Sequence, residues 1–263
     1  MYNPNHRVFK LPSADEIFAL WTANPRGLPG CWGSIDGKHF QITAGADDNQ
    51  SFRCRKGFRS LNVVATVDLH RRFRFVAPIY PGNTNDSFIH TSSGFGRAMA
   101  SRAWPPQGCT RPLVSGLHLQ PFIVADAGFA GSDLLVKPFP GRGLTPNERN
   151  FNRRLSAIRV GSEQAWADVT HRFRFWKCAC EWKGEEWQRH VSHAILACMA
   201  IHNICLDYGD PVPNDDGCDE AAEPGFFGED DEETVTLPVL IENIHRLGAC
   251  SCAPRSCSLG CGI

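Results

Sequence analysis

The sequence predicts one α/β domain followed by a polar tail, and three patterns support this fold class. Residues 61–67 form a β-branched run and residues 73–80 alternate in character, which is typical of two neighbouring antiparallel strands. Residues 121–125 are continuously apolar, as in a strand buried on both faces, and they end at Asp126. Apolar residues recur at helical spacing from Thr145 onward. This order favours an α/β domain whose functional site lies at strand ends.

The first half of the chain predicts several shorter elements. Residues 1–30 are polar and rich in turn-forming residues, so we expect an irregular approach to the first strand. That strand is expected to be short, over residues 32–36. A helix is expected to begin at Asp86, capped by one of the two residues before it, and to direct Phe88 toward the core. Residues 101–120 are expected to form a loop.

The second half of the chain predicts two long helices. Thr145 is followed by a proline and then by Glu148 at the third helical position, which is the pattern of a capping box. This helix is expected to run past Glu163, and a second one to span about residues 184–208. The sequence then becomes acidic and finally cysteine-rich, as in a disordered tail. We therefore expect three regions: an approach segment over 1–30, a catalytic domain over 31–208 and a disordered tail over 209–263.

Charge is distributed unevenly along the chain, although the formal net charge is only -1. Residues 207–233 contain twelve carboxylates and no lysine or arginine, which leaves 16 acidic against 27 basic residues elsewhere, a net charge of about +11. Such a basic body favours a polyanionic partner such as nucleic acid. No stretch approaches the roughly 20 apolar residues of a membrane span, so we expect no membrane association. The twelve cysteines are unevenly spaced, which favours a reducing compartment over a disulfide framework.

Four carboxylates occupy positions where a functional site is expected. Two lie at the ends of predicted strands, one at a turn into a helix and one on a helix: Asp36, Asp126, Asp86 and Glu163. Clustered carboxylates repel one another and resist desolvation, so a cation between them stabilises the cluster. Oxygen ligands of this kind select Mg²⁺ or Mn²⁺, and a pair of such ions supports phosphodiester displacement.

Each of these residues also has a purely structural explanation. Asp36 could cap a turn, and Asp86 could cap a helix. Glu163 could pair with Arg159, one helical turn away. Asp126 is the hardest to explain in this way, because a carboxylate directly after five apolar residues needs a partner. The spacing alone does not identify a nuclease.

Eight stretches of the chain, taken in order, resemble the Harbinger-type transposases and their domesticated nuclease relatives. The first is Gly-Ser-Ile-Asp-Gly-Lys-His at residues 33–39, and the third is Pro-Gly-Asn-Thr-Asn-Asp-Ser at residues 81–87. The others are residues 55–63, 125–129, 144–149, 151–153, 163–175 and 202–205. No single motif identifies the family, but the ordered set extends from about Gly30 to Tyr208.

The resemblance implies an RNase H-like fold, in which helices flank a mixed sheet, with an Asp, Asp, Glu metal site. By position it implies that Asp36, Asp126 and Glu163 are catalytic and bind the metal ions. It also implies that Asp86 is an additional metal ligand. The implied activity is cleavage of DNA by a two-metal mechanism that depends on Mg²⁺ or Mn²⁺. In such systems a separate Myb-like protein supplies part of the DNA binding and nuclear import. The resemblance therefore implies this partner and a nuclear location, or a cytoplasmic one without the partner.

Basic residues near these motifs are candidates for holding the DNA backbone. Those assigned to DNA binding are Arg55, Lys56, Arg59, Arg149, Arg153, Arg154 and Arg159. For either of the two basic stretches alone, a solvated charged surface is an equal alternative. A homo-oligomer is compatible with the sequence.

One difference from the family follows Glu163, where the chain has Gln164 and the family usually has arginine. A domesticated or decayed DNA-binding protein without turnover is therefore the main alternative. An unrelated hydrolase, with two carboxylates in general acid and base roles and no metal, is a third.

Overall fold

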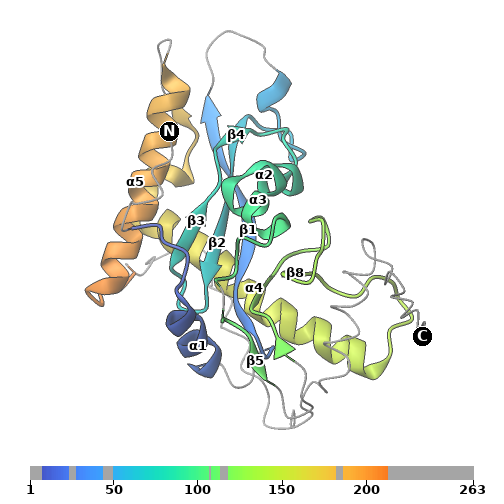
Figure 1. Ribbon diagram of the computed structural model, residues 1–263. Coiled ribbons are helices and arrows are strands. Elements are labelled where there is room, and N and C mark those ends of the chain that lie inside the picture. Colours follow the sequence, from blue (N-terminus) through green and yellow to red (C-terminus); the bar gives the residue numbers. More distant parts are fainter. Residues whose placement is uncertain are drawn as a thin grey trace, which may run out of the picture.

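The computed structural model describes residues 8–23, 28–43, 50–106, 108–112, 118–181 and 186–212. One sheet lies at the centre, with helices packed against both of its faces (Figure 1). Within these ranges no helix is both long and apolar enough to cross a membrane. The predicted disorder of the tail beyond residue 212 falls outside the described residues.

The sheet combines antiparallel and parallel strands. Its strands are β1 (Cys31–Thr43), β2 (Ser60–Asp68), β3 (Phe73–Val76), β4 (Tyr80–Pro81), β7 (Phe122–Val124), β8 (Leu135–Val136) and β9 (Cys180–Glu181). The main path runs in the order β3–β2–β1–β7–β8, with β4 paired to β2 and β9 paired to β1. β1 is antiparallel to β2 and parallel to β7, and β7 is parallel to β8. This mixed sheet flanked by helices confirms the α/β, RNase H-like fold class.

β1 is much longer than the short strand expected over residues 32–36. Its pairing with β2 extends from Gly33 opposite Asp68 to Gln41 opposite Ser60, well past Asp36. All nine residues of β2 are buried, so β2 provides an inner template on which β1 can continue. The polar residues after Ile35 interrupt the apolar pattern, which is why the sequence underestimates the strand.

Two groups of helices cover opposite faces of the sheet. The helices are α1 (Ala14–Ala23), α2 (Asp86–Ser92), α3 (Gly94–Ala100), α4 (Pro146–Arg172) and α5 (Trp187–Asp207). The first three pack on the face where Ile35 is buried with Phe95 of α3. The last two enclose the core on the other face, where the Phe40 ring lies 6.0 Å from that of Trp166. Successive side chains of β1 therefore enter different cores.

Two predicted helix starts are confirmed by their capping interactions. The Thr145 hydroxyl accepts from the Glu148 N–H, and the Glu148 carboxylate accepts from the Thr145 N–H. Asn85 caps α2 by accepting from the Ser87 N–H with its side-chain oxygen. Both signals are local, so the sequence alone is sufficient to recognise them.

Three further expectations about the fold need correction. The approach segment contains α1, which begins with another reciprocal pair of hydrogen bonds, between Ser13 and Glu16. Phe88 is 56% exposed, because it lies on the outer side of α2 while Ile89 enters the core. Residues 101–120 include a small two-stranded sheet. Its strands are β5 (Arg111–Pro112) and β6 (His118–Leu119).

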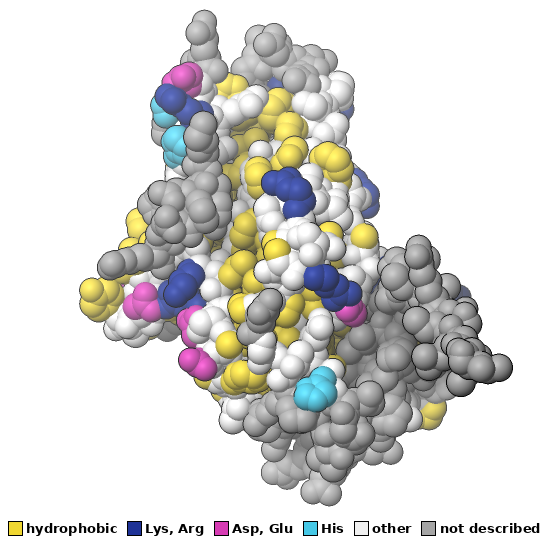
Figure 2. All heavy atoms as spheres, viewed as in Figure 1, with side chains coloured by type: hydrophobic (Ala, Val, Ile, Leu, Met, Phe, Trp, Pro, Cys, Tyr) yellow, Lys and Arg dark blue, Asp and Glu magenta, His cyan; other side chains and the backbone are white. Residues whose placement is uncertain are grey.

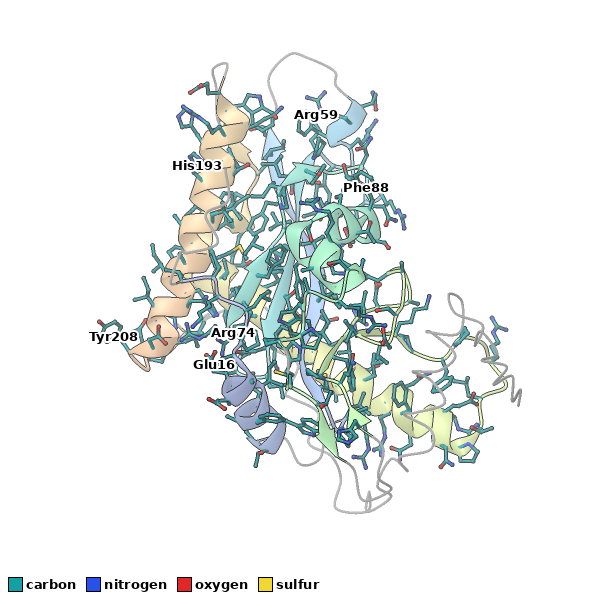
Figure 3. The ribbon with its side chains drawn as sticks, in the orientation of Figure 1. Glu16, Arg59, Arg74, Phe88, His193 and Tyr208 are labelled. Atoms are coloured by element: carbon teal, nitrogen blue, oxygen red, sulfur yellow. The ribbon has the colours of Figure 1, made fainter. Side chains whose placement is uncertain are left out.

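An ion-pair network fastens α1 to the sheet. Arg74 of β3 donates to Asp68 at 2.6 Å and to Glu16 of α1 at 2.9 Å. Figure 3 shows Arg74 and Glu16 side by side where α1 meets the strands. Asp68 is only 2% exposed, and its carboxylate also accepts from the His70 and Arg72 N–H groups, so several donors compensate for its burial.

Candidate active site

Asp36 and Asp126 are brought to corresponding positions by the pairing of β1 with β7. Ser34 lies opposite Val124 in this parallel pair, and each carboxylate comes two residues later in the chain. β7 ends at Val124, so β7 does not cover the edge of β1 beyond this point. The two aspartates therefore mark an open edge in the middle of the sheet.

The residues of β1 at this open edge alternate between the two faces of the sheet. Asp36 shares its face with Phe40, on the side of α4. Gly37 and His39 share the opposite face, on the side of α2. Residues 36–39 are all partly exposed, whereas the five residues before them are buried. The strand thus presents polar groups on both sides of its open edge.

Asp86, the first residue of α2, reaches this edge on the side of Gly37. A Cβ atom at position 37 would lie 2.6 Å from an Asp86 carboxylate oxygen, so a larger residue there would displace the carboxylate. The Asn62 amide donates to Asp86 Oδ1 at 2.6 Å and to the Thr84 carbonyl at 2.9 Å. Asn62 is 1% exposed and holds Asp86 from within the sheet. Asn85 is the N-cap, so capping does not explain Asp86.

Asp36 lies in an environment that disfavours its negative charge. The pKa of Asp36 is raised from 3.8 to about 6, chiefly by burial and in part by the negative charges of Glu163 and Asp86. A backbone hydrogen bond from Gly37 and the positive charge of Arg159 act in the opposite direction. Because Asp36 lies inside a strand, the turn-capping explanation does not hold. A nearby cation would stabilise this carboxylate.

Glu163 lies on the outer side of α4 and does not join the other carboxylates. Its side chain is 59% exposed and lies 3.5 Å from the Arg159 guanidinium, one helical turn earlier. The structure thus contains the ion pair that the structural explanation of Glu163 requires. Pairs of this kind contribute only about 0.3–0.5 kcal/mol, so rotating Glu163 away from Arg159 requires little free energy.

One polar pocket lies beside the carboxylates. It has a volume of about 140 Å³ and is lined by His39, Arg55, Gly82, Asn83, Thr84, Asn85, Asp86, Asp126 and Gly128. Asp126 Oδ1 accepts from the Gly128 N–H at 2.8 Å, which orients this carboxylate after β7. The Ala130 N–H donates to Ser87 Oγ at 2.9 Å and ties the same loop to α2. Two carboxylates from different elements and an arginine thus share one pocket.

The carboxylates are of the chemical type that binds a divalent cation, but their side chains do not converge on one point in this structure. Across the ranges that the structure describes, no three His, Cys, Asp or Glu side chains come close enough to hold a metal ion. Asp36 nevertheless has a destabilised negative charge, and Asp86 and Asp126 approach the same strand edge. Carboxylate oxygens are the ligands that Mg²⁺ and Mn²⁺ prefer.

The basic residues predicted to bind DNA fall into two groups. Arg55, Lys56 and Arg59 precede β2, and Arg149, Arg153, Arg154 and Arg159 lie along α4. Arg154 is 8% exposed, and we leave it out of the proposed DNA surface. Arg59 lies at the top of the view in Figure 3, whereas α4 begins at the lower right of Figure 1. On the face that Figure 2 shows, Lys and Arg side chains are scattered and do not form one patch.

Two residues of the site were not predicted from the sequence. Asn62 positions Asp86, and His39 lines the pocket. Asn62 had a recognisable signal, because an amide within the β-branched run 61–67 must find hydrogen-bond partners. His39 lies in one of the stretches that resemble the transposases, but nothing in the sequence alone assigns it a partner.

Comparisons with known proteins identify related sequences over the region that contains this site. A family model described as DDE superfamily endonuclease matches residues 35–203, which contain all four carboxylates. Protein ALP1-like from Arabidopsis thaliana is 27% identical over 194 residues, covering 72% of this chain and 46% of that protein. A protein named "Putative nuclease HARBI1" from Homo sapiens is 27% identical over 198 residues, covering 74% and 50%. Its Mus musculus counterpart is 28% identical over 207 residues, covering 76% and 52%.

The matched range has a clear structural meaning. It begins in β1 and ends in α5, so it includes the main sheet, the open edge of β1 and the helices α2 to α4. The chain spans about half the length of these curated relatives. No solved structure matches the chain. The family model covers well over half of the residues, including the main sheet and the four carboxylates described above. The chain therefore belongs to the DDE superfamily endonucleases and is homologous to Harbinger transposase-derived nucleases.

Proposed function

We propose that this chain is a divalent-metal-dependent DNA endonuclease, in which Asp36, Asp126 and Glu163 hold the metal ions and Asp86 is an additional ligand. The observation that carries the proposal is the approach of Asp36, Asp86 and Asp126 to one open edge of β1. Family membership supports a nuclease or transposase type of reaction. Arg55 in the pocket and Arg159 near Asp36 support DNA as the substrate.

Each residue of the proposed metal site has a separate role. Asp36 in β1 and Asp126, two residues after the end of β7, would offer anionic oxygens from neighbouring positions of one sheet. Asn62 holds Asp86 in place from within the sheet. Rotation of Glu163 away from Arg159 would add the fourth carboxylate. When bound, Mg²⁺ or Mn²⁺ would supply Lewis acidity for hydrolysis of a phosphodiester.

The Glu163–Arg159 pair favours a second candidate, a DNA-binding protein without turnover. Incubation of the purified protein with supercoiled plasmid separates the two. The endonuclease nicks the plasmid with Mg²⁺ or Mn²⁺ and leaves it intact with a chelator. The second candidate retards the plasmid in gels under every condition and nicks it under none. Nicking that persists with the chelator would indicate a hydrolase that uses no metal.

The wider setting of the activity is also part of the proposal. We propose residues 31–208 as the catalytic unit and the nucleus as its location. A separate Myb-like protein is the proposed partner for DNA binding and import. Separate expression of the unit and localisation of the tagged chain, with and without that protein, test these points.

Replacing Asn62 by alanine is expected to weaken Mn²⁺ binding by about 10- to 100-fold, the usual effect of losing a residue that orients a metal ligand. The reason is that Asp86 loses the amide that holds its carboxylate. Isothermal titration with Mn²⁺ measures the change, and a thermal melt shows that the variant is folded. Asn147→Ala, an exposed asparagine on α4, is the matched control. Equal affinities for wild type and Asn62→Ala would show that Asn62 has no such role.

Replacing Arg153 by alanine is expected to weaken binding to unrelated duplexes alike and to reduce the slope of log affinity against log salt by about one. Arg153 is exposed on α4 and suits a contact with the DNA backbone. Fluorescence anisotropy over a salt series measures both quantities. Arg189→Ala, on the exposed side of α5, should change neither. Loss of affinity for one sequence only would indicate base recognition instead.

A further inference from the structure

His39 has no role in the proposed metal site, yet it lies beside it. It lines the pocket that Arg55, Asp86 and Asp126 also line. It comes three residues after Asp36, on the face of β1 that carries Gly37. The pocket therefore combines two carboxylates with an imidazole and a guanidinium. Two kinds of group are present: anionic oxygens that suit a cation, and donors that suit an anion.

Ser60 and Phe58 contact the imidazole of His39 and fix its orientation. Its Nδ1 lies 3.0 Å from the Ser60 hydroxyl oxygen, and the Phe58 ring meets it edge-on at 6.4 Å. Ser60 is 0% exposed, and a Cβ at Gly82 would lie 2.2 Å from its Oγ, so this hydroxyl is tightly enclosed. Within the described part of the chain, no hydrogen bond is recorded at Nε2. With Nδ1 beside Ser60, we assign Nε2 to the pocket that His39 lines.

The surrounding charges define what this nitrogen can bind. Burial lowers the pKa of His39, and the positive charges of Lys56 and Arg55 lower it as well, against the opposing effect of Asp86. This shift favours the neutral ring, in which Nε2 carries the proton when the Ser60 hydroxyl donates to Nδ1. A neutral N–H beside a guanidinium is suited to an anionic oxygen. The neighbouring carboxylates exclude an isolated anion but admit one that bridges to a bound cation.

We propose that His39 and Arg55 form a phosphate-binding subsite, in which His39 Nε2 donates to a non-bridging oxygen of the DNA backbone next to the carboxylates. The subsite rests on the proposed endonuclease function, because it places the phosphodiester against the metal-binding edge. Arg55 neutralises the charge of the phosphate, and His39 fixes its position. His39 is thus a substrate-contact residue and neither a metal ligand nor a structural core residue.

Two substitutions of His39 separate its two nitrogens. In His39→Asn the shorter amide ends near the position of Nδ1, so it can keep the Ser60 hydrogen bond but places no donor in the pocket. In His39→Gln the amide nitrogen takes the place of Nε2. Loss of a hydrogen bond to a charged group should weaken binding of a fluorescein-labelled duplex by about tenfold in His39→Asn, measured with Ca²⁺ present in place of Mn²⁺ so that the carboxylates hold a cation. His39→Gln should bind within about threefold of wild type, since it keeps the donor.

Two control variants and the wild type show how each outcome is to be interpreted. His193→Asn removes an exposed histidine of α5, labelled in Figure 3, and should leave binding unchanged. Arg55→Ala should weaken binding and flatten its salt dependence, as expected for a phosphate contact. The subsite is overturned when His39→Asn binds like wild type, or when a folded His39→Gln loses as much affinity as His39→Asn. A wild type that binds DNA but nicks no plasmid with Mn²⁺ overturns the endonuclease alone, and a wild type that binds no duplex overturns both.

Discussion

Asp126→Asn is expected to lose metal-dependent nicking by at least about 100-fold while remaining folded, a larger effect than that of residues that merely orient metal ligands. The substitution removes a negative charge from the end of β7 and changes the volume very little. The remaining oxygen can still accept from the Gly128 N–H, so the loop after β7 should keep its conformation. The expected loss is therefore one of metal affinity and reaction rate, with the fold retained.

The measurement is the rate of plasmid nicking with Mn²⁺ at several metal concentrations. Asp133→Asn is a matched control, because Asp133 is a nearby aspartate that pairs with the exposed Arg102. It should nick like the wild type. A rate for Asp126→Asn equal to that of wild type would remove Asp126 from the site. A variant that melts far below wild type would show that Asp126 is structural.

Asp36→Asn is expected to stabilise the metal-free protein at pH 7 by up to about 3 kcal/mol, the free energy that corresponds to raising a pKa from 3.8 to about 6. Above pH 6 this carboxylate is ionised in both folded and unfolded states, and its burial among negative charges lowers the free energy of unfolding. As the pH falls through 6, the folded protein takes up a proton before the unfolded chain does, so the penalty fades toward pH 4. Asparagine has no charge to bury at any of these values.

Denaturant unfolding of wild type and Asp36→Asn, with a chelator and at a series of pH values, measures this effect. The difference between them should be largest above pH 6 and should narrow between pH 6 and pH 4. Mn²⁺ should reverse the order, because binding to the folded wild type adds stability that the variant cannot gain. A variant less stable than wild type at pH 7 without metal would contradict the electrostatic account of Asp36.

The sequence predicted the local features of this fold well and the long-range ones less well. The start of α4 depends on Thr145 and Glu148, three residues apart, and it appears where expected. The capping pair of Ser13 and Glu16 is equally local, and α1 could have been predicted from it. The length of β1 depends on β2, whose nine buried residues lie further along the chain. Such pairing is not encoded in the strand itself.

In the candidate site, too, the local features could be predicted from the sequence and the long-range ones could not. Asp36 and Asp126 could be predicted because each stands close to an apolar strand, and the parallel pairing of β1 with β7 places them at corresponding positions. The orientation of Glu163 could not be predicted. For this exposed side chain on α4, the free energies of contacting Arg159 and of joining the carboxylates differ by less than about 1 kcal/mol. The role of His39 depends on Ser60, which lies 21 residues away on the next strand.

Direct titration of Mn²⁺ binding, followed by electron paramagnetic resonance of the unbound ion, tests the central claim that these carboxylates form a metal site. The wild type should bind Mn²⁺ saturably, with affinity lost in Asp36→Asn and in Asp126→Asn and unchanged in Asp133→Asn. Glu163→Gln should bind more weakly than wild type, because it removes the negative charge of the carboxylate that rotates to join the site. Equal Mn²⁺ affinity in the wild type, Asp36→Asn and Asp126→Asn would contradict the account.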